Sequence, residues 1–234
     1  MKKGKLYIVA TPIGNLDDIT IRAIDTMKSV DFVACEDTRV TRKILNHYKI
    51  ETPTISYHQH SGESKMLEIR DLLLSGKNIA LVTDAGTPGI SDPGNKLIEF
   101  IVHSSQFSDI VPVPGASAVT AALSVSGFPT DKFVFMGFPP HKKRRKQFFQ
   151  EIADNKYTTV FYESSHRIKK ALQNLAEVLV EERQSASAKA SARQVCVCRE
   201  LTKKFESIYR GSVSEVVGMD ITEKGEFVVI VRSQ

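Results

Sequence analysis

The chain has 234 residues, of which 41% are hydrophobic and 25% charged, a composition ordinary for a globular protein with one large or two small domains. We expect no membrane span, because no run approaches the roughly 20 apolar residues that one requires. Residues 6–10 are too short an apolar run for a signal peptide, so we expect a cytoplasmic protein. Three cysteines argue against a disulfide framework, and a net charge of +5 is compatible with a polyanionic partner.

Ten short runs rich in β-branched residues alternate with helix-like stretches along the chain. Such alternation predicts open α/β sheets whose strands are joined by crossover helices. Two prolines and a glycine at 112–115 interrupt the pattern, so we expect an α/β lobe at 1–114, a second at 115–234 and a ligand cleft where they meet. The expected strands are Leu6–Thr11, Phe32–Glu36, Thr54–His58, Asn78–Asp84, Asp109–Val113, Lys132–Gly137, Thr158–Glu163, Gln194–Arg199, Glu206–Arg210 and Gly225–Arg232.

Two segments of the second lobe carry structural predictions. Cys196 and Cys198 alternate with Val195 and Val197, so both thiols should lie on one strand face, where we expect core packing and not a metal site. The stretch 183–192 (RQSASAKASA) has the composition of a flexible, solvated loop.

The segment 83–94 (TDAGTPGISDPG) follows the fourth expected strand, at the kind of position where open α/β sheets bind ligands. Its three glycines and two prolines exceed what a turn requires, and glycine lets the backbone approach a ligand closely. It matches neither common phosphate-binding motif and holds no basic residue. This favours a ligand that carries an amino acid, a ribose and a sulfonium, with a purely structural loop as the alternative.

Two further loops have the same kind of position. The loop that follows the first strand, at 11–20 (TPIGNLDDIT), makes an abrupt turn, which also suits a plain strand–turn–helix connection. At 113–118 (VPGASA), proline and glycine lead into an expected helix at Ala116–Ser126. The free amides of Ser117 or Ala118 can bind a carboxylate there, and an ordinary helix start is the alternative.

Nine segments in chain order resemble the tetrapyrrole-methylase superfamily of S-adenosylmethionine-dependent enzymes, and more closely its ribosomal RNA branch. The nine together are far more specific than any one of them. They are LYIVATPIGNLDDIT (6–20), CEDTRVTRKIL (35–45), YHQHSGE (57–63), ALVTDAGTPGISDPG (80–94), VPGASAV (113–119), GFPPHKKRR (137–145), FYESSHRI (161–168), RELTKKFES (199–207) and KGEFVVIV (224–231).

The resemblance implies two α/β lobes of the class III methyltransferase fold, with S-adenosylmethionine in the cleft between them. It implies 2′-O-ribose methylation of a cytidine in small-subunit (16S) ribosomal RNA, naked or within the assembled small subunit, by a homodimer. The donor-contacting positions that it implies are Pro12, Asp84, Ala85, Gly86, Thr87, Gly89, Ser117, Ala118, Phe161, Tyr162, Leu201, Gly225 and Glu226.

Two departures from related patterns are informative. Tetrapyrrole-modifying relatives usually have a GDP-type sequence where this chain has residues 83–86 (TDAG), and they lack the CEDTRVT segment. These two differences imply that the substrate is RNA and not a porphyrinoid. The family's FYES segment is usually followed by proline, and Ser165 stands at that position here.

The candidate catalytic residues lie in the segment that follows the second strand, at 35–43 (CEDTRVTRK). A ribose 2′-hydroxyl is a poor nucleophile until its proton is accepted, and Glu36 or Asp37 can accept it. Arg39 and Lys43 can hold a phosphate beside them. The alternative is a capped helix start, with Asp37 at the N-cap and the basic residues on a solvated face.

Two groups of basic residues are candidates for RNA contact. His58 and His60 follow a strand on the same side, where they can act as a base, contact RNA or pack without a role. The run 141–146 (HKKRRK) predicts an RNA backbone grip, with a solvated helix face as the alternative. The candidate RNA contacts are Lys43, His58, His60, Lys142, Lys143, Arg144, Arg145 and Arg167.

Three functions follow from these features. RNA 2′-O-methylation is the first, and methylation of a small tetrapyrrole by the same fold is the second. The basic run favours RNA over an apolar tetrapyrrole. The third, a non-catalytic RNA-binding protein on a methylase scaffold, fits poorly with the intact loop at 83–94. We expect no metal ion, because methyl transfer from a sulfonium needs no Lewis acid.

Overall fold

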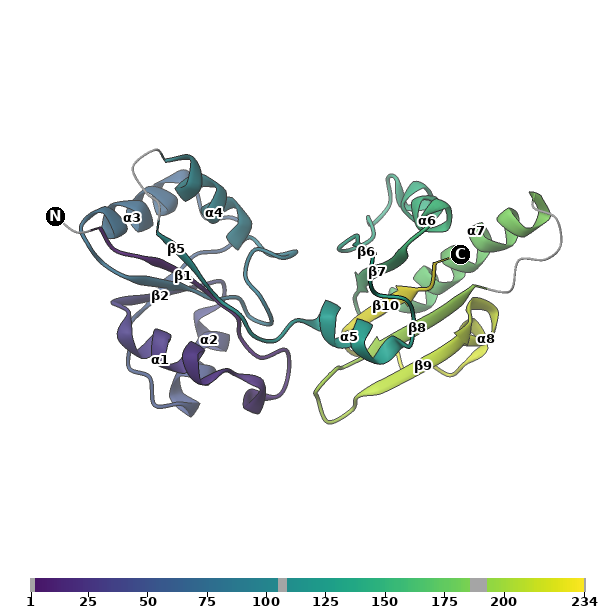
Figure 1. Ribbon diagram of the computed structural model, residues 1–234, viewed down its shortest axis with the longest axis horizontal. Helices are drawn as coiled ribbons and strands as arrows, with labels where there is room; N and C mark the ends of the chain where they lie inside the picture. Colours follow the sequence, from purple (N-terminus) through teal and green to yellow (C-terminus); the bar gives the residue numbers. More distant parts are fainter. Residues whose placement is uncertain (1–2, 105–108, 186–192, 234) are drawn as a thin grey trace. The chain divides into compact units, whose positions relative to one another are not determined.

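The protein is described by a computed structural model that covers residues 3–104, 109–185 and 193–233 (Figure 1). The chain forms two compact α/β units, residues 1–117 and 118–234, whereas the expected lobes divide at 114. Unit 1 contains β1 (Leu6–Val9), the short 3-10 helix η1 (Leu16–Asp18), α1 (Ile21–Ser29), β2 (Phe32–Cys35), α2 (Thr38–His47), β3 (Thr54–Ser56), α3 (Glu63–Leu74), β4 (Ile79–Leu81), α4 (Gly94–His103) and β5 (Ile110–Val113). Unit 2 contains α5 (Ala118–Ser126), β6 (Phe133–Phe135), α6 (Arg145–Asp154), β7 (Thr158–Glu163), α7 (Ile168–Ser185), β8 (Gln194–Arg199), β9 (Ser207–Ser212), α8 (Val213–Gly218) and β10 (Phe227–Val231).

Unit 1 is built on a parallel sheet with the strand order β3-β2-β4-β1-β5. The central strands β2 and β4 are largely buried, as is typical of parallel sheets with helices on both faces, whereas the edge strands β3 and β5 are partly exposed. Ala23 of α1 and Leu45 of α2 pack with Val9 and Val82 on one face, and α3 and α4 cover the other, as Figure 1 shows. Local caps set the helix starts, since the Thr20 side chain accepts the N–H of Ala23 at the beginning of α1.

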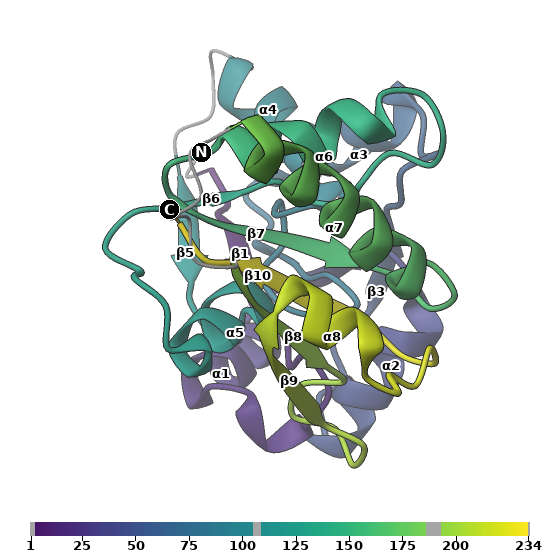
Figure 2. The same ribbon diagram turned by 90° about the vertical axis from the view of Figure 1, so that its right-hand side faces the viewer.

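Unit 2 is built on a mixed sheet with the order β6-β7-β10-β8-β9, in which only β6 and β7 are parallel. The hairpin β8–β9 departs from the expected crossover pattern because residues 200–206 are too few for a crossover helix. Helices α6, α7 and α8 cover one face, in front of the sheet in Figure 2, and α5 packs on the other.

The expected two-lobed α/β fold is confirmed, and all ten expected strands are present, most of them shorter by one or a few residues. Cys196 and Cys198 are buried and unbridged on the α5 face, with their sulfur atoms 3.8 Å apart, which confirms their expected core packing. Of the loop expected at 183–192, residues 183–185 belong to α7, and 186–192 lie outside the described residues. Within the described parts of the chain, no helix combines the length and apolar character needed to cross a membrane.

Candidate functional site

The carboxyl edge of the unit 1 sheet has the geometry of a ligand site. The helices that follow β1 and β2 cover one face of the sheet, and the helix that follows β4 covers the other. β4 lies between β1 and β2 in the sheet. The chain therefore leaves β4 toward one face of the sheet and leaves both neighbouring strands toward the other face. Open α/β sheets bind ligands at such switch points, and the segment 83–94 emerges from β4 at this position.

The first half of this loop is fixed by the neighbouring strand ends. Thr11 and Gly86 exchange both backbone hydrogen bonds, at 2.9 and 3.1 Å, and the Thr11 hydroxyl donates to the Thr83 carbonyl at 2.9 Å. The Thr87 hydroxyl donates to the Ala116 carbonyl at 3.2 Å. Gly86 has a φ of +86°, which favours glycine. The loop between Thr83 and Thr87 is therefore held in one conformation, with Ala85 exposed at its tip.

Asp92 fixes the second half of the loop, and it is not among the functional residues predicted from the sequence. Its carboxylate accepts the N–H groups of Gly89 and Gly94 at 3.0 and 2.8 Å, and the Thr83 hydroxyl at 2.6 Å. The signal was present in the sequence, since Asp92 precedes Pro93 and a glycine, a context in which aspartate side chains bind nearby backbone.

Three carboxylates share this edge of the sheet with one histidine. Burial raises the pKa of Glu36, the charges of Asp84 and Asp92 raise it further, and His58 opposes them. Burial likewise raises the pKa of Asp84, although the Asp37 N–H donates to its carboxylate at 3.3 Å. A partly buried acidic edge of this kind is suited to a cationic ligand.

Asp37 and Arg39 form a local pair at the start of α2. Asp37 is the N-cap, as the helix-start alternative predicted, and it accepts the Arg39 N–H at 2.8 Å. The Arg39 guanidinium also binds the Asp37 carboxylate, at 2.7 Å between Nη2 and Oδ2. These bonds lower the pKa of Asp37 to about 2, so its carboxylate is a weak base. Lys43 lies further along α2 and is exposed.

His58 and His60 lie just beyond β3, which ends at Ser56. Their rings are 6.2 Å apart, and the His60 N–H donates to Nδ1 of His58 at 3.2 Å. His58 is half-buried near Glu36, whereas His60 is exposed. His58 is thus the one of the pair that the structure brings to the acidic edge.

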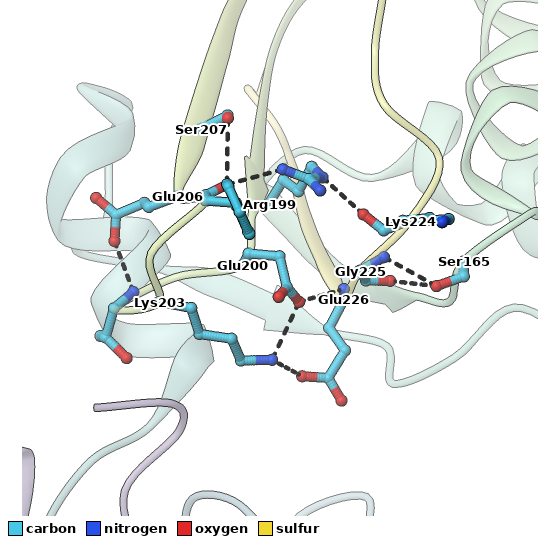
Figure 3. Close-up of polar contacts among 11 residues, drawn as sticks. Ser165, Arg199, Glu200, Lys203, Glu206, Ser207, Lys224, Gly225 and Glu226 are labelled. Carbon is cyan, nitrogen blue, oxygen red and sulfur yellow. Dashed lines mark hydrogen bonds and ion pairs between the residues drawn. The ribbon is translucent and has the colours of Figure 1, made fainter. Parts of the chain in front are cut away.

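In unit 2, the turns that follow β8 and precede β10 are joined by a dense polar network (Figure 3). Glu200 donates its N–H to the Glu226 carbonyl and accepts the Glu226 N–H at its side chain, both at 2.9 Å. Lys203 bridges the two carboxylates, at 3.0 Å from Glu200 and 2.6 Å from Glu226. Leu201 lies half-buried within the first of these turns. The turns therefore behave as one ordered unit.

Ser165 fixes Gly225 from the opposite side of the network. Its hydroxyl donates to the Gly225 carbonyl at 2.7 Å and accepts the Gly225 N–H at 3.0 Å (Figure 3). Gly225 has a φ of +118°, and a Cβ there would lie 2.6 Å from Cγ of Glu200, so no other residue fits without a shift. Ser165, which stands where the resemblance led us to expect proline, thus makes two hydrogen bonds to an expected donor position.

Arg145 and Arg167, two of the expected RNA contacts, bind a buried carboxylate inside unit 2. The Glu163 carboxylate, buried at the end of β7, lies 3.4 Å from Arg145 and 3.3 Å from Arg167. Arg145 is 9% exposed and also binds Asn174. A charge run in a sequence does not show which member turns inward. In the run 141–146 it is Arg145, and the exposed members are His141, Lys142, Lys143, Arg144 and Lys146.

Phe161 and Tyr162 differ in what they can offer a ligand. The Phe161 ring is fully buried and packs with Phe148 and Phe149, so only its backbone is available. Tyr162 is half-buried on the other face of β7.

Three further expected donor contacts lie outside the sheet of unit 2. Pro12 is buried beside Thr11 in unit 1. Ser117 precedes α5 and Ala118 begins it, and both are half-buried. Among residues 3–104, 109–185 and 193–233, no three His, Cys, Asp or Glu side chains are grouped to hold a metal ion.

The sequence model of the tetrapyrrole (corrin/porphyrin) methylases matches residues 5–217. The chain belongs to this family. The chain is 46% identical over 233 residues to ribosomal RNA small subunit methyltransferase I of Halalkalibacterium halodurans, covering 98% of the chain and 76% of that protein. It is 41% identical to the protein of the same name from Thermotoga maritima, covering 99% of both.

Solved structures of the family share the fold. The cobalamin biosynthetic enzyme cobalt precorrin-4 methyltransferase matches with a TM-score of 0.68 and 18% identity, over 97% of this chain and 94% of that chain. Uroporphyrin-III-C-methyltransferase from Thermus thermophilus matches with a TM-score of 0.62 and 16% identity, over 97% and 94%. Identities this low show the fold alone.

Tetrapyrrole methylases use S-adenosylmethionine, and the chain is a methyltransferase of this kind. The residues of unit 1 fit such a donor, which carries a sulfonium, an ammonium and a ribose diol. The acidic edge offers negative charge to the cations, and the ordered loop that follows β4 exposes Ala85 at its tip. Neither feature suits a nucleoside triphosphate, because residues 83–94 hold no basic side chain.

Proposed function

We propose that this protein transfers a methyl group from S-adenosylmethionine to the 2′-hydroxyl of a cytidine in small-subunit (16S) ribosomal RNA. The observation that carries this proposal is the 46% identity, over 98% of the chain, to a protein named ribosomal RNA small subunit methyltransferase I. The exposed basic residues at 141–144 support an RNA substrate over a tetrapyrrole.

The proposed donor contacts come from ordered backbone in each unit. In unit 1 they are Pro12, Asp84, Ala85, Gly86, Thr87 and Gly89, on segments that Thr11 and Asp92 hold in place, and Ser117, next to the Ala116 carbonyl that accepts the Thr87 hydroxyl. In unit 2 they are Ala118, the backbone of Phe161, the side chain of Tyr162, and Leu201, Gly225 and Glu226. Fixed backbone groups of this kind bind without first having to be ordered.

A bound donor supplies a methyl group that is already activated as a sulfonium, so the chain's own residues have two tasks. They align the ribose hydroxyl for in-line attack on the methyl carbon, in which a C–O bond forms as the C–S bond breaks. They also accept the hydroxyl proton, a task for which Glu36 is better suited than Asp37, whose pKa is about 2. We assign Arg39 to holding Asp37 and the start of α2.

RNA contacts in this proposal involve Lys43, His58 and His60 of unit 1 and the exposed residues Lys142, Lys143 and Arg144 of unit 2. Arg145 and Arg167 act indirectly, because their guanidinium groups are engaged inside unit 2. We further propose that the enzyme works as a cytoplasmic homodimer on the RNA either naked or within the small subunit.

The deciding experiment incubates the protein with radiolabelled S-adenosylmethionine and one of three acceptors: small ribosomal subunits that lack the modification, naked small-subunit RNA, or a porphyrinoid. We expect label in RNA, at one cytidine that becomes resistant to alkaline cleavage on its 3′ side. Label in the porphyrinoid alone would establish the tetrapyrrole function instead, and label in neither would refute both.

A further inference from the structure

An aromatic side chain is exposed on the loop that joins β6 to α6. Phe138 is 51% exposed and lies between the edge strand β6 and the helix α6. Its ring lies 5.3 Å from the ring of Tyr162, which in turn lies 4.9 Å from Phe135. Phe138 therefore rests on a second and a third aromatic ring, and one of its sides is open to solvent.

The loop that carries Phe138 is held from beneath. Arg167 donates to the Pro139 carbonyl at 2.6 Å, and Arg145 donates to the Pro140 carbonyl at 3.1 Å. Both arginines are oriented by the buried Glu163 carboxylate. Two consecutive prolines restrict the backbone further. The exposed ring is thus presented on a rigid support and loses little freedom when it binds a partner.

The surroundings of the ring are basic. His141, Lys142, Lys143 and Arg144 are all exposed directly after the two prolines, and residues 132–150 contain no acidic side chain. Among the phenylalanines that the structure describes, Phe133 at 41% and Phe205 at 65% are also exposed; Phe133 has no such run beside it, and Phe205 has two lysines before it and Glu206 after it. Aromatic platforms beside clustered cations are typical of single-stranded nucleic acid sites, where a base stacks while the backbone binds the cations.

We propose that Phe138 is a stacking platform for an unpaired base of the RNA substrate, with Lys142, Lys143 and Arg144 binding the phosphates next to that base. This inference rests on the proposed RNA methylation and names the feature of the RNA that the enzyme recognises. An unpaired base is required because bases within an A-form helix have no free face. The charge of the loop selects RNA as the partner over a second copy of this chain, whose matching loop would carry the same charge.

The test measures binding of the wild-type enzyme and of Phe138→Leu, Phe138→Trp and Phe133→Leu variants to small-subunit RNA, over a range of salt concentrations. We expect Phe138→Leu to weaken binding by about 5- to 150-fold, the range found when one stacked base is lost. Phe138→Trp retains an aromatic face and should bind within a few-fold of wild type, as should the exposed control Phe133→Leu. The salt dependence of Phe138→Leu should equal that of wild type, because no phosphate contact is removed.

Three outcomes would overturn the inference. Phe138→Leu binding and methylating RNA as wild type does would show that the ring contacts no base. A loss confined to S-adenosylmethionine affinity would assign the ring to the donor, and a change in oligomeric state by light scattering would assign it to a second copy. Failure of the proposed function looks different, since the wild-type enzyme would then label no RNA at all.

Discussion

Glu36 and Asp37 are adjacent in the sequence, but the pKa values of their carboxyl groups are shifted in opposite directions. Asp37 is fixed by the helix N-terminus and by Arg39, and these contacts lower its pKa to about 2. Burial and the neighbouring charges of Asp84 and Asp92 raise the pKa of Glu36. A general base works best with a pKa closer to the working pH, so the structure separates two residues that the sequence left as equivalent candidates.

This difference predicts unequal effects of two isosteric changes. Glu36→Gln should lower turnover at least 100-fold, within the range for the loss of a general base, and weaken donor binding only several-fold, because one charge of the acidic edge is lost. Asp37→Asn should stay within a few-fold of wild type, because asparagine is an equally good N-cap. Single-turnover rates with small subunits and donor titration by calorimetry would measure both. Equal losses in the two variants would contradict the assignment.

Ser165 provides a second prediction at the scale of one residue. Its hydroxyl both donates to and accepts from the backbone of Gly225. Ser165→Ala should raise the KM for S-adenosylmethionine about fivefold, the equivalent of one net hydrogen bond of ~1 kcal/mol, without changing kcat or the KM for RNA. Steady-state kinetics with each substrate varied in turn would separate these constants.

The neighbouring serine offers a matched control for that change. The Ser164 hydroxyl makes only a 3.4 Å contact to Glu163, so Ser164→Ala should leave the donor KM unchanged. Ser165→Thr keeps the hydroxyl and should restore most of the affinity. If all three variants share the wild-type donor KM, the hydroxyl does not position Gly225 for the donor.

At the scale of elements, the ends of β2 and β4 bring the acidic groups together, and this predicts a pH dependence of donor binding. Each carboxyl is neutral below its pKa, and the pKa values of Glu36 and Asp84 are raised. The sulfonium binds better to the ionised groups, so its affinity should fall several-fold as pH decreases from about 8 to about 5. S-adenosylhomocysteine lacks the sulfonium and should show a weaker dependence. Calorimetry with both ligands measures this, and a constant ratio of their affinities would contradict it.

The Glu163 carboxylate joins β7 to the starts of α6 and α7 through Arg145 and Arg167. We expect this buried network to contribute more to the free energy of unfolding than an exposed ion pair does. Glu163→Gln leaves two arginines partly buried without their counter-charge, which should cost about 3–5 kcal/mol of the free energy of unfolding. Urea denaturation measures the change. The exposed pair Lys169–Glu223, at 3.2 Å, is the control, and Glu223→Gln should cost at most about 1 kcal/mol. Similar costs for both changes would show that the buried network is not stabilising.

The positions of the strands were predicted from the sequence better than the contacts of individual side chains. Short runs rich in β-branched residues located every strand, because such a run is visible in one strand at a time. The antiparallel β8–β9 pairing depends on which strand lies next in space, and the inward turn of Arg145 depends on Glu163, 18 residues away. The bond from Thr83 to Asp92 likewise depends on the return of the loop, whereas the Asp92 bonds to Gly89 and Gly94 are local and the Asp-Pro-Gly sequence already indicated them. Contacts that depend on tertiary pairing are not encoded in local patterns.

At the scale of the whole molecule, the net charge of +5 is small, so the location of positive charge matters more than its amount. Lys142, Lys143 and Arg144 are exposed together on a loop that the interior of unit 2 holds in place. Phosphate contacts release counterions, and each one made to a single strand contributes about 0.7 to the slope of log affinity against log salt.

Changing these three residues to glutamine should therefore reduce that slope by about 2 and weaken RNA binding most at low salt. Arg22 and Lys28 on α1 and Lys49 just beyond α2 are exposed cations outside the proposed contacts, and changing all three to glutamine controls for the loss of three positive charges. Fluorescence anisotropy with small-subunit RNA over a salt series measures each slope. If the control changed the slope as much as the loop variant, the protein's overall charge would drive binding. A specific loss at the loop would show that its rigid support directs the RNA to one surface of unit 2.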